Sequence, residues 1–497
     1  MKRLGYIKRA LGGIGAVLGC LLLLCGLSAC GEKEEASPHI CSGVEWRVTA
    51  EPSCAAPGSK EFVCSCGKVL NTERISPVHR EETVAGAEAT CTETGRSAGK
   101  RCADCGVTLL KESGLPALGH DYENGSCIRC TATPSEGLTF LSNGDGTCLV
   151  SGLGTCTDAT LNLPETSPEG ETVIGVNYSA FSECETIVAV TFPNTATSIG
   201  MFSFDECPNL SRVIIPDSVR EIDMYAFGYA PALRFVSMGN GVKEIDTFAF
   251  IDCKELTDVQ LGSGLEVIRA EAFGGCALRS LTLPESVKEI GSMAFYACDF
   301  SSAYIPAGVT SIRGDVFRAC ENLRQITVNV NNPVYHSSGN CLIETETGRL
   351  LQGCSTSVIP ADGSVTELAD HAFFRCRDLT GLVIPDSVTR IGDMVFYDCD
   401  GLTSLQLGKG VERIGENAFW GCIRLVSLVI PAAVSEIQIY AFSDCDALSR
   451  VTFENPQGWI CGEGSYVTEG DPIDVTDPSA NARHLRMTYC GYRWMRK

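Results

Sequence analysis

Histidine is scarce in this chain, and positive charge is in deficit. Only 6 of the 497 residues are histidines, and there are 39 lysines and arginines against 61 aspartates and glutamates. Few histidines leave little material for general-base catalysis, and the Gly-x-Ser-x-Gly, His-Glu-x-x-His and P-loop patterns are absent from the sequence. The formal charge of -22 argues against nucleic acid or an anionic membrane surface as the partner. We therefore expect a protein that is not an enzyme.

Long apolar runs are also few. The run at residues 11–27 follows four basic residues, and no later stretch is long enough to span a bilayer. Leu27-Ser28-Ala29-Cys30 resembles the lipobox of bacterial lipoproteins, which implies a signal peptide over residues 1–29 and a lipid on Cys30. An ordinary signal peptide or a membrane helix is the alternative. We expect an exported protein held by this lipid on the outer face of the cell membrane, with residues 30–37 as its tether.

A repeat dominates the rest of the sequence. Phenylalanines recur every 22 or 23 residues apart from one wider gap: Phe181, Phe204, Phe227, Phe250, Phe273, Phe295, Phe317, Phe373, Phe396, Phe419 and Phe442. Each is followed three residues later by a cysteine, except that Ala230 takes this place after Phe227. Self-similarity at this period indicates stacked units that bury their apolar faces against one another. The sequence predicts a repeat solenoid of about 12 coils of 22–23 residues with a parallel β-sheet.

Each repeat carries a short strand signal. In one repeat, Leu210, Val213 and Ile215 precede Pro216, and the alternation at the end of this spacing suits a strand closed by proline. A glycine follows the second apolar pair at four repeats, which predicts a bend with positive φ at each of them: Gly200, Gly291, Gly392 and Gly415.

The repeats resemble the BspA-type leucine-rich repeat family of bacterial surface proteins. The resemblance rests on Ala372–Leu379 followed by Val383–Gly392, and on end segments such as Gly154–Thr157 and Gly458-Trp459. It covers about residues 138–497. It implies a curved parallel-sheet leucine-rich repeat solenoid at the cell surface, with adhesion to host or microbial macromolecules as the role.

The chain divides by composition. We expect the following parts: Cys/His-rich modules at 38–135, an N-terminal cap at 136–160, the solenoid at 161–453 with a hairpin insertion at 331–356, and a C-terminal cap at 454–497. The insertion is predicted to turn at Thr347-Gly348 with Glu346 facing Arg349. This register sets Cys341 opposite Cys354, and a disulfide between them is compatible with it.

The cysteines of the repeats are expected to be buried thiols. Free cysteine is among the most buried residue types, and stacked positions at about 4.8 Å separate Cβ atoms more than a disulfide tolerates. Disulfides between adjacent coils remain the alternative because export favours oxidation.

The cysteines of residues 38–135 form a different pattern. A Cys, Cys-x(1 or 2)-Cys, His order occurs twice and predicts two structural zinc sites, with these ligands: Cys54, Cys64, Cys66 and His79, then Cys91, Cys102, Cys105 and His120. Cys127 and Cys130 add a further Cys-x-x-Cys. Modules of this size with few aromatic residues need such a staple. Disulfides or unpaired thiols are the alternatives.

The outward row of the predicted sheet is the candidate ligand-binding face. Its central positions carry no charge: Ile214, Ser237, Gln260, Thr282, Tyr304, Thr327, Val383, Gln406 and Val429, with Thr191 and Thr452 at the two ends. β-branched residues also simply suit strands. We expect a surface recognition or adhesion protein that binds an extracellular protein or glycan through this row. The alternative is a structural spacer or coat component without a specific ligand.

Overall fold

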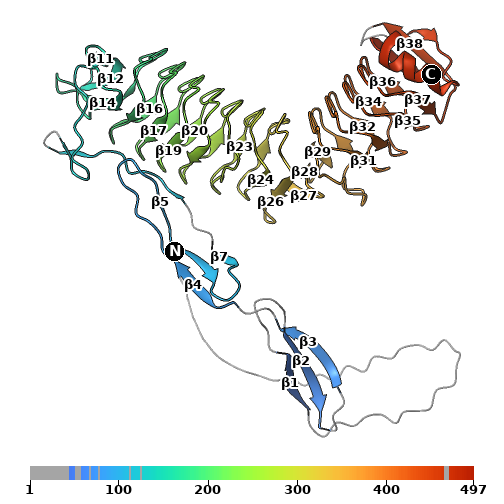
Figure 1. Ribbon diagram of the computed structural model, residues 1–497, viewed down its shortest axis with the longest axis horizontal. Helices are drawn as coiled ribbons and strands as arrows, with labels where there is room; N and C mark the ends of the chain where they lie inside the picture. The colour runs from blue at the N-terminus through green and yellow to red at the C-terminus, as the bar shows by residue number, and fades with distance from the viewer. Residues whose placement is uncertain are drawn as a thin grey trace, which may run out of the picture. The chain divides into compact units, whose positions relative to one another are not determined.

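The computed structural model divides into two units, which are residues 1–80 with 103–105, and residues 81–102 with 106–497. It describes these residues: 44–50, 58–65, 69–75, 79–110, 114–123, 126–463 and 469–497. The predicted signal peptide and Cys30 lie outside them. In the described part of the chain, no helix has the length and apolarity that a bilayer-crossing segment needs. The first unit contains one antiparallel sheet of three strands (Figure 1): β1 (Val44–Ala50), β2 (Gly58–Cys64) and β3 (Val69–Ile75).

The second unit begins with small antiparallel sheets. We call residues 81–102 and 106–135 the N-terminal module. Its paired strands are β4 (Glu81–Val84) with β6 (Gly99–Cys102) and β7 (Thr108–Leu110), β5 (Gly95–Arg96) with β8 (Gly114–Leu115), and β9 (Tyr122–Glu123) with β10 (Ser126–Cys127). These sheets are short, so other contacts must hold the module together.

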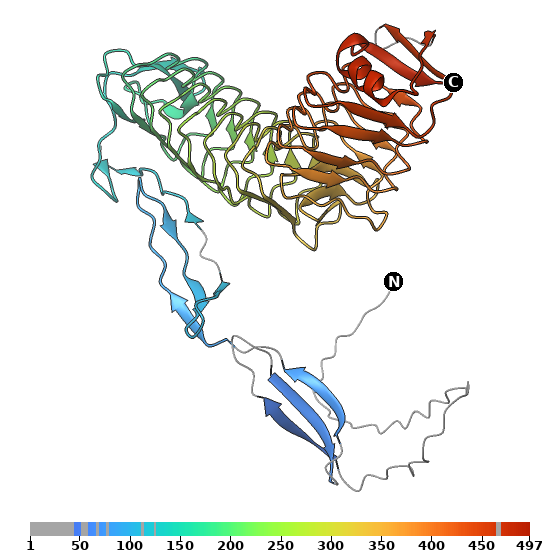
Figure 2. The same cartoon turned by 45° about the vertical axis from the view of Figure 1, so that its right-hand side comes forward.

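The predicted solenoid is confirmed, and most coils contribute two parallel strands rather than the one expected (Figures 1 and 2). We call the longer strands the front sheet: β13 (Thr160–Asn162), β15 (Ala189–Thr191), β17 (Arg212–Ile215), β19 (Phe235–Met238), β21 (Asp258–Gln260), β24 (Ser302–Ile305), β26 (Gln325–Val328), β31 (Gly381–Val383), β33 (Ser404–Gln406), β35 (Ser427–Ile430) and β37 (Arg450–Phe453). Pairing along the front sheet is interrupted after β21, β26 and β33.

The other row of strands forms the back sheet, and most of its strands are two residues long. Its first part is β11 (Thr139–Ser142), β12 (Thr147–Gly152), β14 (Thr172–Val176), β16 (Ser198–Ile199), β18 (Glu221–Ile222), β20 (Glu244–Ile245), β22 (Val267–Ile268), β23 (Glu289–Ile290) and β25 (Ser311–Ile312). Its second part begins with the insertion: β27 (Tyr335–Ser338), β28 (Cys341–Glu344), β29 (Arg349–Gln352), β30 (Glu367–Leu368), β32 (Arg390–Ile391), β34 (Arg413–Ile414) and β36 (Glu436–Ile437). The isoleucine or leucine of each two-residue strand points into the core, which is why the second apolar pair of the repeat forms a strand.

The repeated phenylalanines form the interior of the stack. Their rings stack face to face between neighbouring coils, with centroids 5.0–5.9 Å apart from Phe181 to Phe317 and 5.1–5.2 Å apart from Phe373 to Phe442. All are buried. Each ring therefore fills the space above the preceding coil, and no coil could bury its apolar side chains alone.

The cysteines of the repeats are confirmed as free thiols, and all but Cys184 of this row are buried. Eight of them donate to the backbone carbonyl of the phenylalanine one coil earlier, at sulfur–oxygen distances of 3.1–3.3 Å: Cys207, Cys253, Cys276, Cys298, Cys320, Cys399, Cys422 and Cys445. Burial raises the pKa of Cys207 to about 12, so the thiol keeps the proton it donates. Most of these carbonyls also accept from a backbone amide, as Phe181 does from Cys184 at 3.2 Å, so the thiols add a second donor. At the Phe227 carbonyl, where no amide donor is found among the described residues, the thiol of Cys253 supplies the hydrogen bond.

The prediction of positive φ at the four repeat glycines is wrong. Gly200, Gly291, Gly392 and Gly415 have ordinary backbone angles, while residues two before and two after most of the repeated phenylalanines take the left-handed conformation, as Phe202 does at 57°. These glycines are instead needed where the backbones of neighbouring coils lie close together. A Cβ on Gly200 would lie 2.6 Å from the carbonyl oxygen of Val176 in the preceding coil.

The predicted insertion forms the first strands of the second part of the back sheet, but its predicted register is wrong. Ile343 pairs with Leu350 and Leu342 with Gln352 across a bulge, so the turn is longer than two residues and Cys341 is not set opposite Cys354. Both cysteines are buried free thiols. Cys354 instead accepts a hydrogen bond from the Ser357 hydroxyl at 3.5 Å.

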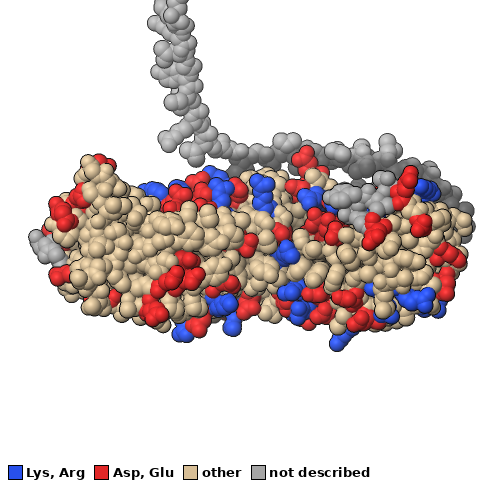
Figure 3. Space-filling model, turned by 90° about the horizontal axis from the view of Figure 1, so that it is seen from above, with Lys and Arg blue, Asp and Glu red and all other residues tan. Residues whose placement is uncertain are grey.

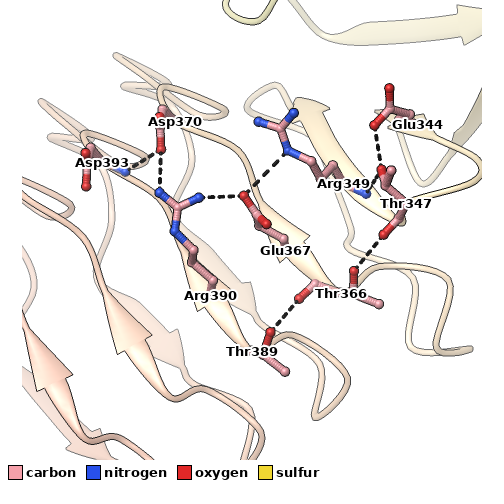
Figure 4. A network of polar contacts seen from close by, with 9 residues as sticks. All are labelled: Glu344, Thr347, Arg349, Thr366, Glu367, Asp370, Thr389, Arg390 and Asp393. Carbon is pink, nitrogen blue, oxygen red and sulfur yellow. Dashed lines mark hydrogen bonds and ion pairs between the residues drawn. The ribbon is translucent and has the colours of Figure 1, made fainter.

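A polar network joins the insertion to the following coils (Figure 4). Glu367 lies between Arg349 and Arg390, at 3.5 and 2.6 Å, and Arg390 also reaches Asp370 at 3.3 Å. The Thr366 hydroxyl donates to the carbonyl of Thr347 at 2.9 Å. These side chains are partly exposed, so each ion pair contributes less than about 1 kcal/mol. They fix the seam where the repeat is interrupted.

The C-terminal cap closes the second end of the core. It comprises β38 (Trp459–Glu463), β39 (Asp471–Pro472), α1 (Pro478–Arg483), a π-helical turn η1 (His484–Thr488) and β40 (Tyr492–Arg496). β40 pairs antiparallel with β36, which ends the run of parallel strands. Trp494 is buried and stacks on Phe453 at 6.2 Å, so it covers the last coil.

Candidate metal centre and recognition face

Four side chains of the N-terminal module converge on one point. Cys91, His120, Cys127 and Cys130 each offer a ligand atom, and these atoms lie within 4.8 Å of one another. Cys127 ends β10, and Cys130 follows it in a turn in which the Thr131 amide donates to the Cys127 carbonyl at 2.9 Å. Only Cys130 is exposed. The arrangement is a buried Cys/His cluster that could hold a metal ion.

The distances in this cluster fit zinc better than a disulfide. The sulfur atoms of Cys91 and Cys127 are 3.7 Å apart, and the sulfur of Cys130 lies 3.3 Å from Nδ1 of His120. A tetrahedral zinc site with bonds of about 2.3 Å to sulfur separates its sulfur ligands by roughly 3.8 Å. A disulfide would bring them to about 2.05 Å. Three thiols and one imidazole are also a common structural zinc set.

The predicted grouping of these ligands is wrong. Cys91 and His120 were grouped by sequence spacing with Cys102 and Cys105, but the structure brings them together with Cys127 and Cys130. The sequence pattern predicts that the four ligands of each site come from one repeat of the Cys, Cys-x(1 or 2)-Cys, His order. In the structure, the Cys-x-x-Cys turn that follows the histidine completes the site.

The other predicted ligands fall in several places. Cys105 lies 3.6 Å from His79 in the first unit, while Cys102 ends β6 in the second. Cys64 is buried at the end of β2. Cys54 and Cys66 lie outside the described residues, so the first predicted set stays a prediction.

The Cys/His cluster adjoins a segment that lies on the front sheet. We call Gly114–His120 the covering segment. The amide of Ala117 donates to the Ser237 hydroxyl at 2.9 Å, and the side chain of Asn194 donates to the carbonyl of His120 at 3.0 Å. His120 thus belongs to both the cluster and the contact with the solenoid.

Part of the predicted ligand-binding row is buried where the covering segment lies on it. Ile214 and Ser237 are 1 % and 0 % exposed, so the prediction that they face an external ligand is wrong in this structure. A Cβ on Gly114 would overlap the side-chain oxygen of Gln260, which shows how closely the segment lies on that coil. Arg212 holds the same region by reaching the carbonyl of Thr92 and the carboxylate of Glu93. The sequence held no signal for this cover because the contacts join residues about 75 to 145 positions apart.

The middle of the row is irregular. Thr282 is exposed but belongs to no strand, so the front ladder is interrupted on both sides of its coil. Tyr304 is 45 % exposed, and its hydroxyl accepts a hydrogen bond from Asn329 at 2.9 Å. Thr327 is half-buried and donates to the carbonyl of Ala303 at 3.3 Å.

The C-terminal end of the row is open to solvent. Val383 is 57 % exposed and Val429 is 50 % exposed, with Gln406 and Thr452 also exposed beside them. A hollow lies where the front sheet is interrupted between β33 and β35. Its lining includes Gln406, Val429 and Thr452, with charged side chains at the edge from Asp386, Lys409, Arg450 and Glu454. This exposed set, Val383, Gln406, Val429 and Thr452, is called the C-terminal row below.

Charged side chains elsewhere are mainly a solvated surface. The face in Figure 3 carries acidic side chains along its length, with basic ones interspersed. Asp205 is an exception because it is 9 % exposed and its Oδ1 has no hydrogen-bond partner. Burial, with the charges of Glu206 and Glu183, raises the pKa of Asp205 to about 6.

The repeats match a known family. Residues 160–276, 243–347 and 349–460 match the family described as BspA type leucine rich repeat region, in six copies that cover more than half of the chain. The chain belongs to the BspA-type leucine-rich repeat family. No curated protein matches it.

Solved structures share the fold of this BspA-type protein. A leucine rich cell surface protein from Faecalibacterium prausnitzii is 24 % identical, with 66 % of this chain and 95 % of that chain covered at a TM-score of 0.50. The pneumococcal vaccine antigen PcpA is 19 % identical, with 67 % of this chain and 83 % of that chain covered, also at 0.50. At these identities the likeness is one of fold.

Proposed function

We propose that this protein recognises an extracellular protein or glycan at the bacterial cell surface through the C-terminal row. The main support is that four uncharged side chains in register on stacked coils are exposed. Two of them are valines, Val383 at 57 % and Val429 at 50 % exposure. Exposed apolar side chains beside a hollow are typical of interaction sites. The likeness to a leucine rich cell surface protein of F. prausnitzii and to the pneumococcal vaccine antigen PcpA supports the surface location.

The proposed attachment is a lipid on Cys30 after removal of residues 1–29. It rests on the lipobox pattern in the sequence and on the apolar run before it. Mass spectrometry of the protein from membranes should find a diacylglyceryl group on Cys30. An intact N-terminus or an unmodified cysteine would contradict the anchor.

The proposed role of the N-terminal module is structural. We propose that Cys91, His120, Cys127 and Cys130 hold one Zn²⁺, which would leave no open position for a substrate. The metal would fix His120 and with it the covering segment. Metal analysis of the purified chain, and of the Cys127→Ser variant, tests whether a zinc ion is bound there.

The binding function is tested with the full chain on immobilised extracellular matrix proteins and on a glycan array. Val429→Lys places a charge in the C-terminal row and should abolish binding. Val330→Lys is the matched control, because Val330 is 95 % exposed and lies outside the row. Binding that ignores Val429→Lys would contradict the proposal, and absence of any binding would favour the alternative of a structural spacer.

A further inference from the structure

The front sheet already holds an extended piece of polypeptide. The covering segment Gly114–His120 lies against the coils of Gln260, Ser237 and Pro193 in that order. It therefore crosses the strands and runs along the stack, rather than adding to the sheet edge. Its sequence, Gly-Leu-Pro-Ala-Leu-Gly-His, contains no acidic residue, lysine or arginine.

Side chains of the solenoid bind the backbone of this segment. A hydroxyl on the front sheet accepts from the amide of Ala117, and an amide side chain at the end of a coil donates to the carbonyl of His120. Between these two points the apolar Ile214 is buried. The coils beneath the segment thus combine polar side chains that bind its backbone with the buried apolar side chain of Ile214.

The C-terminal row combines the same two kinds of side chain on coils that nothing covers in the described structure. Gln406 offers an amide and Thr452 a hydroxyl, while Val383 and Val429 offer exposed apolar surface. Strand spacing of about 4.8 Å matches a chain that advances about 3.3 Å per residue when it takes one to two residues per coil. The row holds no aromatic ring on which a sugar could stack.

We propose that the C-terminal row binds an extended, uncharged segment of a partner protein, running along the stack as the covering segment does. This inference rests on the proposed function and names its partner class. The exposed valines supply apolar contact, and Gln406 and Thr452 bind backbone amide and carbonyl groups. Charged side chains at the edge, Lys409 among them, favour partners whose charges flank the bound segment.

The test pans a displayed library of unstructured peptides, about 12 residues long to span four coils at about 3.3 Å per residue with ends to spare, against the full chain. Enriched peptides should be uncharged at their centre, and their affinity should fall at least about tenfold with Val429→Lys. Gln406→Ala should weaken them as well, since it removes the amide and leaves the charge unchanged. Val330→Lys should leave the affinity unchanged.

The outcomes separate this inference from the proposed function. Enriched peptides that ignore both row variants would overturn the inference. If a glycan array instead gives binding that Val429→Lys abolishes, the row is a recognition face but its partner is not a polypeptide. If neither probe gives binding that depends on Val429, the inference and the proposed function both fail.

Discussion

The thiol ladder gives a prediction that depends on details of the repeat. Cys253 is buried, and its thiol donates to the carbonyl of Phe227 at 3.2 Å. Cys253→Ala would leave this carbonyl without that donor, which costs about 1–3 kcal/mol. The lost sulfur contributes a further ~1 kcal/mol of packing, by analogy with a buried methylene. We expect a loss of about 2–4 kcal/mol in the free energy of unfolding.

The chain supplies both a control and a reverse experiment. Cys184 begins the row, is only half-buried and contacts Thr186 instead of a phenylalanine carbonyl, so Cys184→Ala should cost less than about 1 kcal/mol. Ala230 is buried where the ladder is interrupted, and Ala230→Cys should restore the donor to Phe204 and stabilise by ~1 kcal/mol.

Urea unfolding followed by circular dichroism measures the global change, and hydrogen exchange of the neighbouring amides localises it, because long repeat arrays do not always unfold in two states. Equal losses for Cys253→Ala and Cys184→Ala would refute the ladder as a stabilising feature. So would a clear destabilisation by Ala230→Cys.

Three further outcomes follow from single sites. The pKa of Asp205 is raised to about 6, so its contribution to stability grows as pH falls from about 6 toward 4; Asp205→Asn should remove that dependence and stabilise by ~1 kcal/mol at pH 7.5 in thermal melts. A Cβ on Gly353 would overlap the ring of Phe373, so Gly353→Ala should displace the first ring of the second stack and lower the melting temperature, whereas Gly314→Ala, at an exposed glycine with open space around its Cβ position, should do so only slightly. Chelation, or Cys127→Ser, should release the covering segment and raise hydrogen exchange across it, while exchange at Cys422 in the distant coils stays unchanged.

The solenoid architecture was predictable because the same pattern of residues recurs in many copies along the chain. The phenylalanine and cysteine spacing identifies the coil, the stacked interior and the free thiols, and the structure confirms each of them. The second strand of the coils was not predicted, because a two-residue strand such as Glu221–Ile222 is too short to show an alternating pattern. The prediction of positive φ at the repeat glycines failed because glycine is also required where two coils approach closely, and the sequence does not distinguish the two causes.

The sites were less predictable because they depend on contacts between distant residues. Spacing identified cysteine and histidine ligands in the module, but which of them share a site depends on how the chain folds back, as Cys91 with Cys127 shows. The row of outward positions was read correctly as uncharged. Its division into a covered part at Ser237 and an open part at Val429 follows from the covering segment, which no local pattern announces.

The division of the front sheet is tested most directly by thiol reactivity. Ser237→Cys and Gln406→Cys place a new thiol on the same sheet, one beneath Gly114–His120 and one in the C-terminal row. After brief exposure of the full chain to a maleimide, peptide mass spectrometry should find Cys introduced at 406 modified and that at 237 unmodified. Comparable modification at both positions would contradict the account.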